Sequence, residues 1–137
     1  MQSRVDLCTK RHQNGYNCAQ AVACAYADLV GMDEETMFKV TEGLGLGQGA
    51  MLGTCGAVAG ACVLAGMKNS CGDLSNPNSK GSTYKLVKEI TETFKADHGT
   101  VICRELKGVD TGKVVLSCPD CIRNAAALAE KVLFSEE

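Results

Sequence analysis

Apolar residues recur at helical spacing along most of the chain. In the first such segment Val5, Cys8 and His12 stand at i, i+3 and i+7, which predicts a helix over residues 2–13. Capping residues and glycines set the bounds of further predicted helices over 18–31, 33–43, 55–66 and 83–99, a short one over 101–107 and a last one over 118–134. Only residues 114–116 favour a short extended piece. We therefore predict one all-α domain over residues 1–137, a single compact bundle of about six helices.

Several of the predicted helices begin at residues that commonly cap helices. Asn17 is followed three residues later by Gln20, a variant of the capping box. Asp33 precedes two glutamates, which are favoured in the first turn of a helix. Pro119 stands at the expected start of the last helix, where its missing N–H costs nothing.

More than half of the 15 glycines lie within residues 43–66. The first part of this stretch is expected to be a loop, and Thr54 is expected to be the N-cap of a helix that ends at Gly66. Cys55 would then occupy the first helical position. Its sulfur would face unpaired backbone N–H groups and the positive end of the helix dipole, which favour a thiolate. We expect three glycines of this stretch to line the site: Gly53, Gly56 and Gly60.

Cysteine recurs at the predicted helix starts. Cys18 and Cys55 take the first helical position, Cys103 lies in the first turn of the short helix, and Cys118 and Cys121 bracket the first turn of the last helix. If these starts converge, their aligned N–H groups would stabilise negative charge on sulfur, either on free thiolates or on metal ligands. The C-x-x-C formed by the last two cysteines fits a dithiol or half of a metal site.

The composition excludes several classes of function. The chain is 45% hydrophobic but has only three Tyr, three Phe and no Trp, so its core must consist of smaller side chains. A net charge of −2 argues against binding to nucleic acid or to an anionic membrane. The longest apolar run is far shorter than the roughly 20 residues that span a bilayer, and no apolar run follows the N-terminal charges as in a signal peptide. We expect a cytoplasmic protein without membrane insertion.

The cysteine count of nine is odd, which argues against the disulfide framework of a secreted protein. In a reducing compartment, some of these thiols are expected to bind metal or to carry redox chemistry, and the others to pack. Cys8, Cys24 and Cys62 are expected in the core. Cys71 lies in a polar loop, where it would be exposed, or would act as a resolving thiol if that loop folds over the site.

Four parts of the chain resemble the C-GCAxxG-C-C family. They are GYNCAQAV around Cys18, the pattern GxGxMxGxCGAxxG around Cys55, a later single cysteine before a short helix, and a cysteine that opens the last helix. Members of this family are described as redox-active proteins of about this length with four characteristic cysteines. By position the resemblance implies the set Cys18, Cys55, Cys103 and Cys121, with Cys118 as the alternative to Cys121. It implies redox chemistry and names no substrate.

Three hypotheses about function follow. In the first, a thiol-disulfide oxidoreductase-like site uses Cys55 as the thiolate, Cys121 or Cys103 as the partner that closes a disulfide, and Cys18 as a pocket-lining residue. In the second, the cysteines Cys18, Cys55, Cys103 and Cys121 hold an iron–sulfur cluster or zinc for electron transfer or sensing. In the third, the protein is a non-catalytic helical interaction module. The redox partner stays open, and the small-residue helix fits a homodimer contact as well as packing within one subunit.

Overall fold

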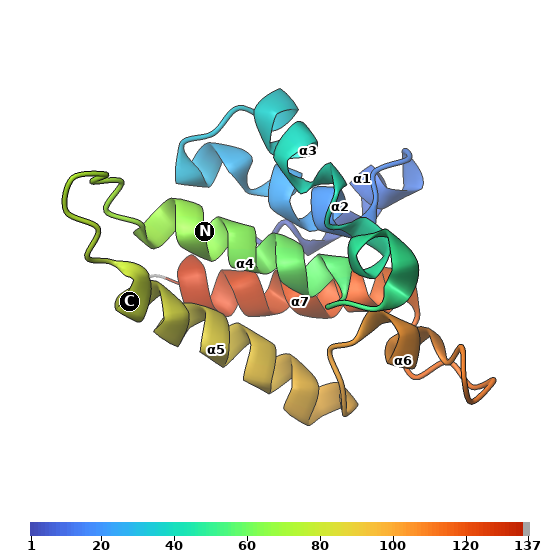
Figure 1. Cartoon of the computed structure of the whole chain (residues 1–137). Helices are drawn as coiled ribbons and strands as arrows, with labels where there is room; N and C mark the ends of the chain where they lie inside the picture. The colour runs from blue at the N-terminus through green and yellow to red at the C-terminus, as the bar shows by residue number, and fades with distance from the viewer. Residues whose placement is uncertain (136–137) are drawn as a thin grey trace.

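The helix predicted after Cys55 is α4, Gly56–Asn69, and it lies beside α7, Cys118–Leu133, across the middle of the computed structural model (Figure 1). The two helices run in the same direction, so both begin at the same end of the molecule (Figure 1). The structure describes residues 1–135.

The other helices surround this central pair. α5, Lys80–His98, packs against both of them, and α2, Cys18–Ala25, packs against them from the other side together with α1, Val5–Gln13 (Figure 1). A short 3-10 helix, Ala27–Val30, follows α2, and α3, Glu34–Glu42, packs on α2. The short α6, Cys103–Lys107, lies at the end where α4 and α7 begin (Figure 1). The predicted all-α bundle is confirmed, with seven α-helices in residues 1–135.

The core is built mainly from alanine and other small side chains. Tyr26 and Phe94 are the largest fully buried residues, and most other buried positions on α2, α4 and α7 are Ala, Val or Cys. Small side chains let helix backbones approach closely. A Cβ added at Gly60 of α4 would lie 2.6 Å from the backbone oxygen of Ala19 on α2, so only glycine fits there without a shift.

The N-caps predicted for α2 and α3 are confirmed. The Asn17 side chain accepts a hydrogen bond from the backbone N–H of Gln20 at 2.9 Å, and the Gln20 side chain accepts one from the N–H of Asn17 at 2.9 Å, which completes a capping box. The side chain of Asp33 accepts a hydrogen bond from the N–H of Thr36 at 2.9 Å. These local pairings fix the start of α2, which carries Cys18.

Other predicted helix boundaries are wrong. The N-cap of α4 is Cys55 rather than Thr54, and the helix continues past Gly66 to Asn69 because nothing in its surroundings forces the chain to turn at that glycine. The N-cap of α6 is Ile102, while Thr100 accepts a hydrogen bond from the N–H of Ile102 at 3.0 Å. Residues 114–116 form no strand within the described chain; two backbone N–H groups there bond instead to the last turn of α6.

The segments before α4 and α6 pair with each other. Cys55 donates its backbone N–H to the oxygen of Val101 at 2.7 Å, and Cys103 donates its own to the oxygen of Gly53 at 2.9 Å. These bonds flank an isolated antiparallel bridge. The glycine loop before it turns through left-handed backbone conformations at Gly47, Gln48, Gly49 and Met51. A Cβ at Gly47 would lie 2.6 Å from the Cβ of Cys103. The pairing therefore brings the starts of α4 and α6 together.

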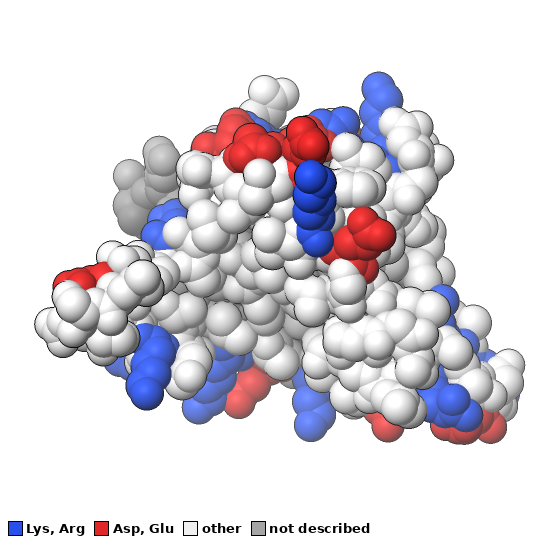
Figure 2. Space-filling model, turned by 45° about the horizontal axis from the view of Figure 1, so that its top comes forward, with Lys and Arg blue, Asp and Glu red and all other residues white. Residues whose placement is uncertain are grey.

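The surface carries both signs of charge. Figure 2 shows Lys and Arg side chains interspersed with Asp and Glu around the edges of one face, with a wide uncharged region between them. None of the helices described in residues 1–135 has the length and apolar character needed to cross a membrane.

We predict that Gly60→Ala and Gly66→Ala shift stability in opposite directions. Both changes give α4 a residue of higher helix propensity, but only the first places a Cβ against backbone. Gly66→Ala should raise the free energy of unfolding by about 0.5–1 kcal/mol, and Gly60→Ala should lower it by about 1–3 kcal/mol. Urea denaturation followed by circular dichroism measures both. Equal effects of the two substitutions would contradict close packing of α2 on α4.

Candidate functional site

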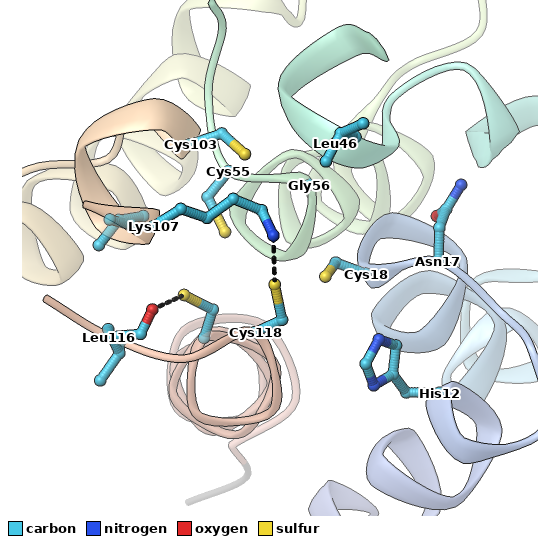
Figure 3. A pocket seen from close by; sticks show the side chains of 12 residues that line it. His12, Asn17, Cys18, Leu46, Cys55, Gly56, Cys103, Lys107, Leu116 and Cys118 are labelled. Carbon is cyan, nitrogen blue, oxygen red and sulfur yellow. Dashed lines mark hydrogen bonds between the residues drawn. The ribbon is translucent and has the colours of Figure 1, made fainter. Parts of the chain in front are cut away.

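A cavity of about 230 Å³ lies where α2, α4, α6 and α7 begin. Five of the nine cysteines line it, and its other walls are largely apolar. In Figure 3 the sulfur atoms of Cys18, Cys55 and Cys118 point into this space from three different helix starts. The lining residues are His12, Asn17, Cys18, Leu46, Cys55, Gly56, Cys103, Leu106, Lys107, Leu116, Cys118 and Cys121. The structure thus places all four cysteines expected at the site, and the alternative Cys118, around one cavity.

Cys55 lies at the floor of the cavity and is 5% exposed. Its pKa is lowered to about 7, first by the neighbouring thiol of Cys121 and then by the backbone N–H groups of Val58 and Ala57 in the first turn of α4. Burial acts against this shift. Cys55 is the N-cap rather than the first helical residue, and an N-cap side chain faces the same unpaired N–H groups. The expected stabilisation of a thiolate at this helix start therefore holds with Cys55 one position earlier.

Cys121 is the neighbour of Cys55 and is 3% exposed. Its thiol donates a hydrogen bond to the backbone oxygen of Leu116 at 3.7 Å (Figure 3). The Cys55 sulfur and burial both raise the pKa of Cys121. The two residues thus form an inner pair, in which Cys121 keeps its proton and Cys55 is the more acidic thiol.

Cys118 lies nearer to solvent than the inner pair, and a cation faces it. The ammonium group of Lys107 donates a hydrogen bond to the Cys118 sulfur at 3.3 Å (Figure 3). The pKa of Cys118 is lowered to about 5, first by the thiol of Cys18, then by Lys107, with a smaller contribution from His12. In return, Cys118 raises the pKa of Lys107. A thiolate–ammonium pair at this position is therefore the charged form that the pocket favours.

Cys18 is the neighbour of Cys118 and forms an outer pair with it. Its pKa is raised, first by the Cys118 sulfur and then by burial, so Cys18 keeps its proton beside the Cys118 thiolate. Cys18 begins α2, whose capping box fixes its position. The two pairs have the same pattern, because each joins one acidic thiol at a helix start to one protonated thiol.

Cys103 has a different environment from the other four. It is buried, and this burial is the main cause that raises its pKa. Cys55 and Cys118 act on its pKa only as charges, and the backbone of Gly47 packs directly on its Cβ. Its place in the structure is that of a wall residue rather than of a partner for Cys55.

The three glycines expected to line the site play different parts. Gly56 lines the cavity, and a Cβ there would press on the backbone of Ala19 and of Gly45. Gly60 packs on α2 outside the cavity, and Gly53 lies behind it, where its backbone oxygen accepts the N–H of Cys103. Two of the three therefore support the pocket without facing it.

The remaining cysteines lie away from the cavity. Cys8 and Cys24 are buried, as expected, and burial raises the pKa of the first to about 12 and of the second to about 11. Cys62 on α4 is partly buried and its pKa is also raised. Cys71 is exposed, in the loop at the opposite end of α4 from the cavity (Figure 1), where a resolving role at this site has no geometric support. Its pKa is lowered to about 7, first by a hydrogen bond with the side chain of Ser79.

Sequence reasoning missed Lys107 and gave His12 no role at the site. Lys107 stands four residues after Cys103 on α6, so the two residues share one face of that helix. That spacing was a usable signal once the cysteine had been singled out. His12 reaches the cavity from α1, and nothing near it along the chain indicates that position.

The positions of the cysteines also bear on the metal hypothesis. No group of three or more His, Cys, Asp or Glu side chains within residues 1–135 has positions suited to hold a metal ion. The five pocket sulfurs instead divide into two pairs and a buried wall residue. Within the described residues the expected ligand set Cys18, Cys55, Cys103 and Cys121 lines one cavity but forms no ready-made metal site, and metal binding stays a prediction.

The fold and the cavity define an all-α protein with a cysteine-lined pocket. Residues 16–132 match the family described as "Putative redox-active protein (C_GCAxxG_C_C)". The chain belongs to this family, which assigns it a redox role. No match was found among curated proteins or among solved structures.

We predict that Lys107→Met raises the pKa of Cys118. Removal of the cation takes away a hydrogen bond and a favourable charge, so the pH at which Cys118 loses its proton should move from about 5 upward, by about one to two pH units. Below this midpoint the thiol is protonated and unreactive; above it the thiolate reacts. The rate of iodoacetamide modification at Cys118, located by mass spectrometry at each pH, gives the midpoint. Lys85→Met, on the exposed face of α5, is the control. An unchanged midpoint in Lys107→Met would contradict the ion pair.

Proposed function

We propose that the pocket carries out thiol–disulfide exchange, with Cys118 as the attacking thiolate and Cys18 as its resolving thiol. The observation that carries this proposal is the Lys107 ammonium 3.3 Å from the Cys118 sulfur. This cation supports a thiolate at neutral pH on Cys118. Of the two acidic cysteines, Cys55 and Cys118, only Cys118 is not fully buried. The role first expected of Cys55 thus passes to Cys118, because Cys55 lies too deep for a bulky disulfide to reach.

The reaction has two exchange steps. The Cys118 thiolate attacks one sulfur of a substrate disulfide, which forms a mixed disulfide and expels the other substrate sulfur as a thiolate. Cys18 then gives up its proton to that leaving thiolate and attacks the Cys118 sulfur. The Cys18–Cys118 disulfide forms and the second substrate sulfur leaves. Two electrons pass from the protein to the substrate, and the reverse sequence oxidises a substrate dithiol.

The cavity supports this chemistry in two further ways. Its apolar walls, among them Leu46, Leu106 and Leu116, limit water around the sulfurs and strengthen the attraction between Lys107 and Cys118. The Cys18 sulfur points toward Cys118 across the cavity (Figure 3), so the resolving step needs little movement. A protein in which the cysteines only pack has no need for a cation beside one of them.

We predict that Cys118→Ser removes the fast reaction of the reduced protein with a small aromatic disulfide. All variants carry Cys71→Ser, because that exposed thiol would react independently. At pH 6 the initial rate of reaction with the aromatic disulfide should fall by about tenfold or more, because the thiolate of the outer pair is lost. In a background that also carries Cys121→Ser, so that the inner pair offers no second resolving thiol, Cys18→Ser should react as fast as its parent but stop at the mixed disulfide, releasing one product thiol where that parent releases two.

Cys62→Ser is the matched control, because Cys62 lies on α4 outside the cavity. An unchanged rate in Cys118→Ser would contradict the proposal. A visible absorption band with stoichiometric metal in anaerobically purified protein would favour the metal hypothesis, and slow, independent modification of all pocket thiols would favour an interaction module.

A further inference from the structure

We infer that Cys55 and Cys121 form a second dithiol couple, which reduces the Cys18–Cys118 disulfide through an internal exchange along the C-x-x-C. This inference rests on the proposed function and extends it, because the pocket then stores four electrons rather than two. The outer pair meets the substrate, and the inner pair receives the disulfide.

The C-x-x-C provides the connection between the pairs. Cys118 and Cys121 stand three residues apart in the first turn of α7, so their side chains lie on one face of the helix, and both line the cavity. In Figure 3 the Cys18 sulfur points toward Cys118, and Cys18 is the first influence on the pKa of Cys118. Cys55 lines the same cavity as Cys121 and is the first influence on its pKa. The four sulfurs therefore follow the order Cys18, Cys118, Cys121, Cys55.

Two thiol–disulfide exchanges move the disulfide inward. Cys121 gives its proton to the cavity solvent and attacks the Cys118 sulfur, so that the Cys118–Cys121 bond forms and Cys18 leaves as a thiolate that takes up a proton. The Cys55 thiolate then attacks the Cys121 sulfur, and Cys118 leaves as a thiolate. The net result is a Cys55–Cys121 disulfide and a reduced outer pair. No oxidant beyond the original substrate disulfide takes part.

The environment of Cys118 sets the direction. The Lys107 ammonium stabilises the Cys118 thiolate, which makes Cys118 a good leaving group in the second exchange. A dithiol whose reduced form is stabilised corresponds to a more oxidising disulfide. Within residues 1–135 the Lys107 ammonium donates its hydrogen bond to Cys118 of the outer pair, so the disulfide is more stable between Cys55 and Cys121.

Burial explains why the inner pair needs the outer one. Cys55 is 5% exposed and Cys121 is 3% exposed, so an external disulfide cannot approach either sulfur directly. Both line the same cavity as the outer pair but are more deeply buried than it. The internal exchange is the route by which electrons held there reach a substrate.

The test maps the disulfide formed by the reduced Cys71→Ser protein after one equivalent of a small disulfide oxidant. After acid quenching and proteolysis without reductant, mass spectrometry identifies the linked peptides. We expect Cys55–Cys121 as the main product, and consumption of two equivalents at full oxidation. Cys121→Ser should trap Cys18–Cys118, and Cys55→Ser should trap Cys118–Cys121. Lys107→Met should raise the share of Cys18–Cys118, because Cys118 then becomes a poorer leaving group.

The outcomes separate the inference from the proposed function. If Cys18–Cys118 is the main product and only one equivalent is consumed, the inner couple is wrong and the outer exchange stands. If no disulfide forms within the pocket, the proposed function itself is wrong. Disulfide mapping of the Cys71→Ser protein, which keeps all five pocket cysteines, decides between these results even if a variant with a pocket serine fails to fold. Cys62→Ser should match the parent in every measurement.

Discussion

Two backbone hydrogen bonds hold the site together. They join the segment before α4 to the segment before α6, from Cys55 to Val101 and from Cys103 to Gly53. They place α6 beside the start of α4, so that Lys107 faces Cys118. Such a short bridge is weak alone, but here it lies against the glycine loop, where Gly47 packs on Cys103 without a side chain between them. The electrostatics of the pocket depend on this backbone pairing.

The thiols of the pocket differ because of their surroundings rather than their chemistry. The pKa values of Cys118 and Cys55 are lowered first by a neighbouring thiol and then by a cation or by backbone N–H groups. The neighbouring thiols, Cys18 and Cys121, have raised pKa values and keep their protons. Low polarity of the walls enlarges both effects. Burial alone, as at Cys8, raises the pKa and gives an unreactive packing residue. One residue type thus serves two purposes in one small core.

The sequence was sufficient to predict the all-α bundle, the caps of α2 and α3, and the recurrence of cysteine at helix starts. These features depend on residues within a few positions of each other, such as Asn17 with Gln20. Helix ends were less predictable: Gly66 permits a stop but does not enforce one, and the N-cap of α4 moved to Cys55 because backbone pairing holds the residues before it. The family resemblance was read from the same motifs and is confirmed by the match over residues 16–132.

The sequence by itself determined that the chain forms helices, that small residues build its core, and that several cysteines stand at helix starts. Only the tertiary structure decided which sulfurs are neighbours, because Cys18 and Cys118 lie on helices at opposite ends of the chain. It also placed Lys107 beside Cys118 and left Cys103 in a wall. Helix formation and capping follow from local hydrogen bonding, whereas charge on a thiol depends on groups that only folding brings within a few ångströms.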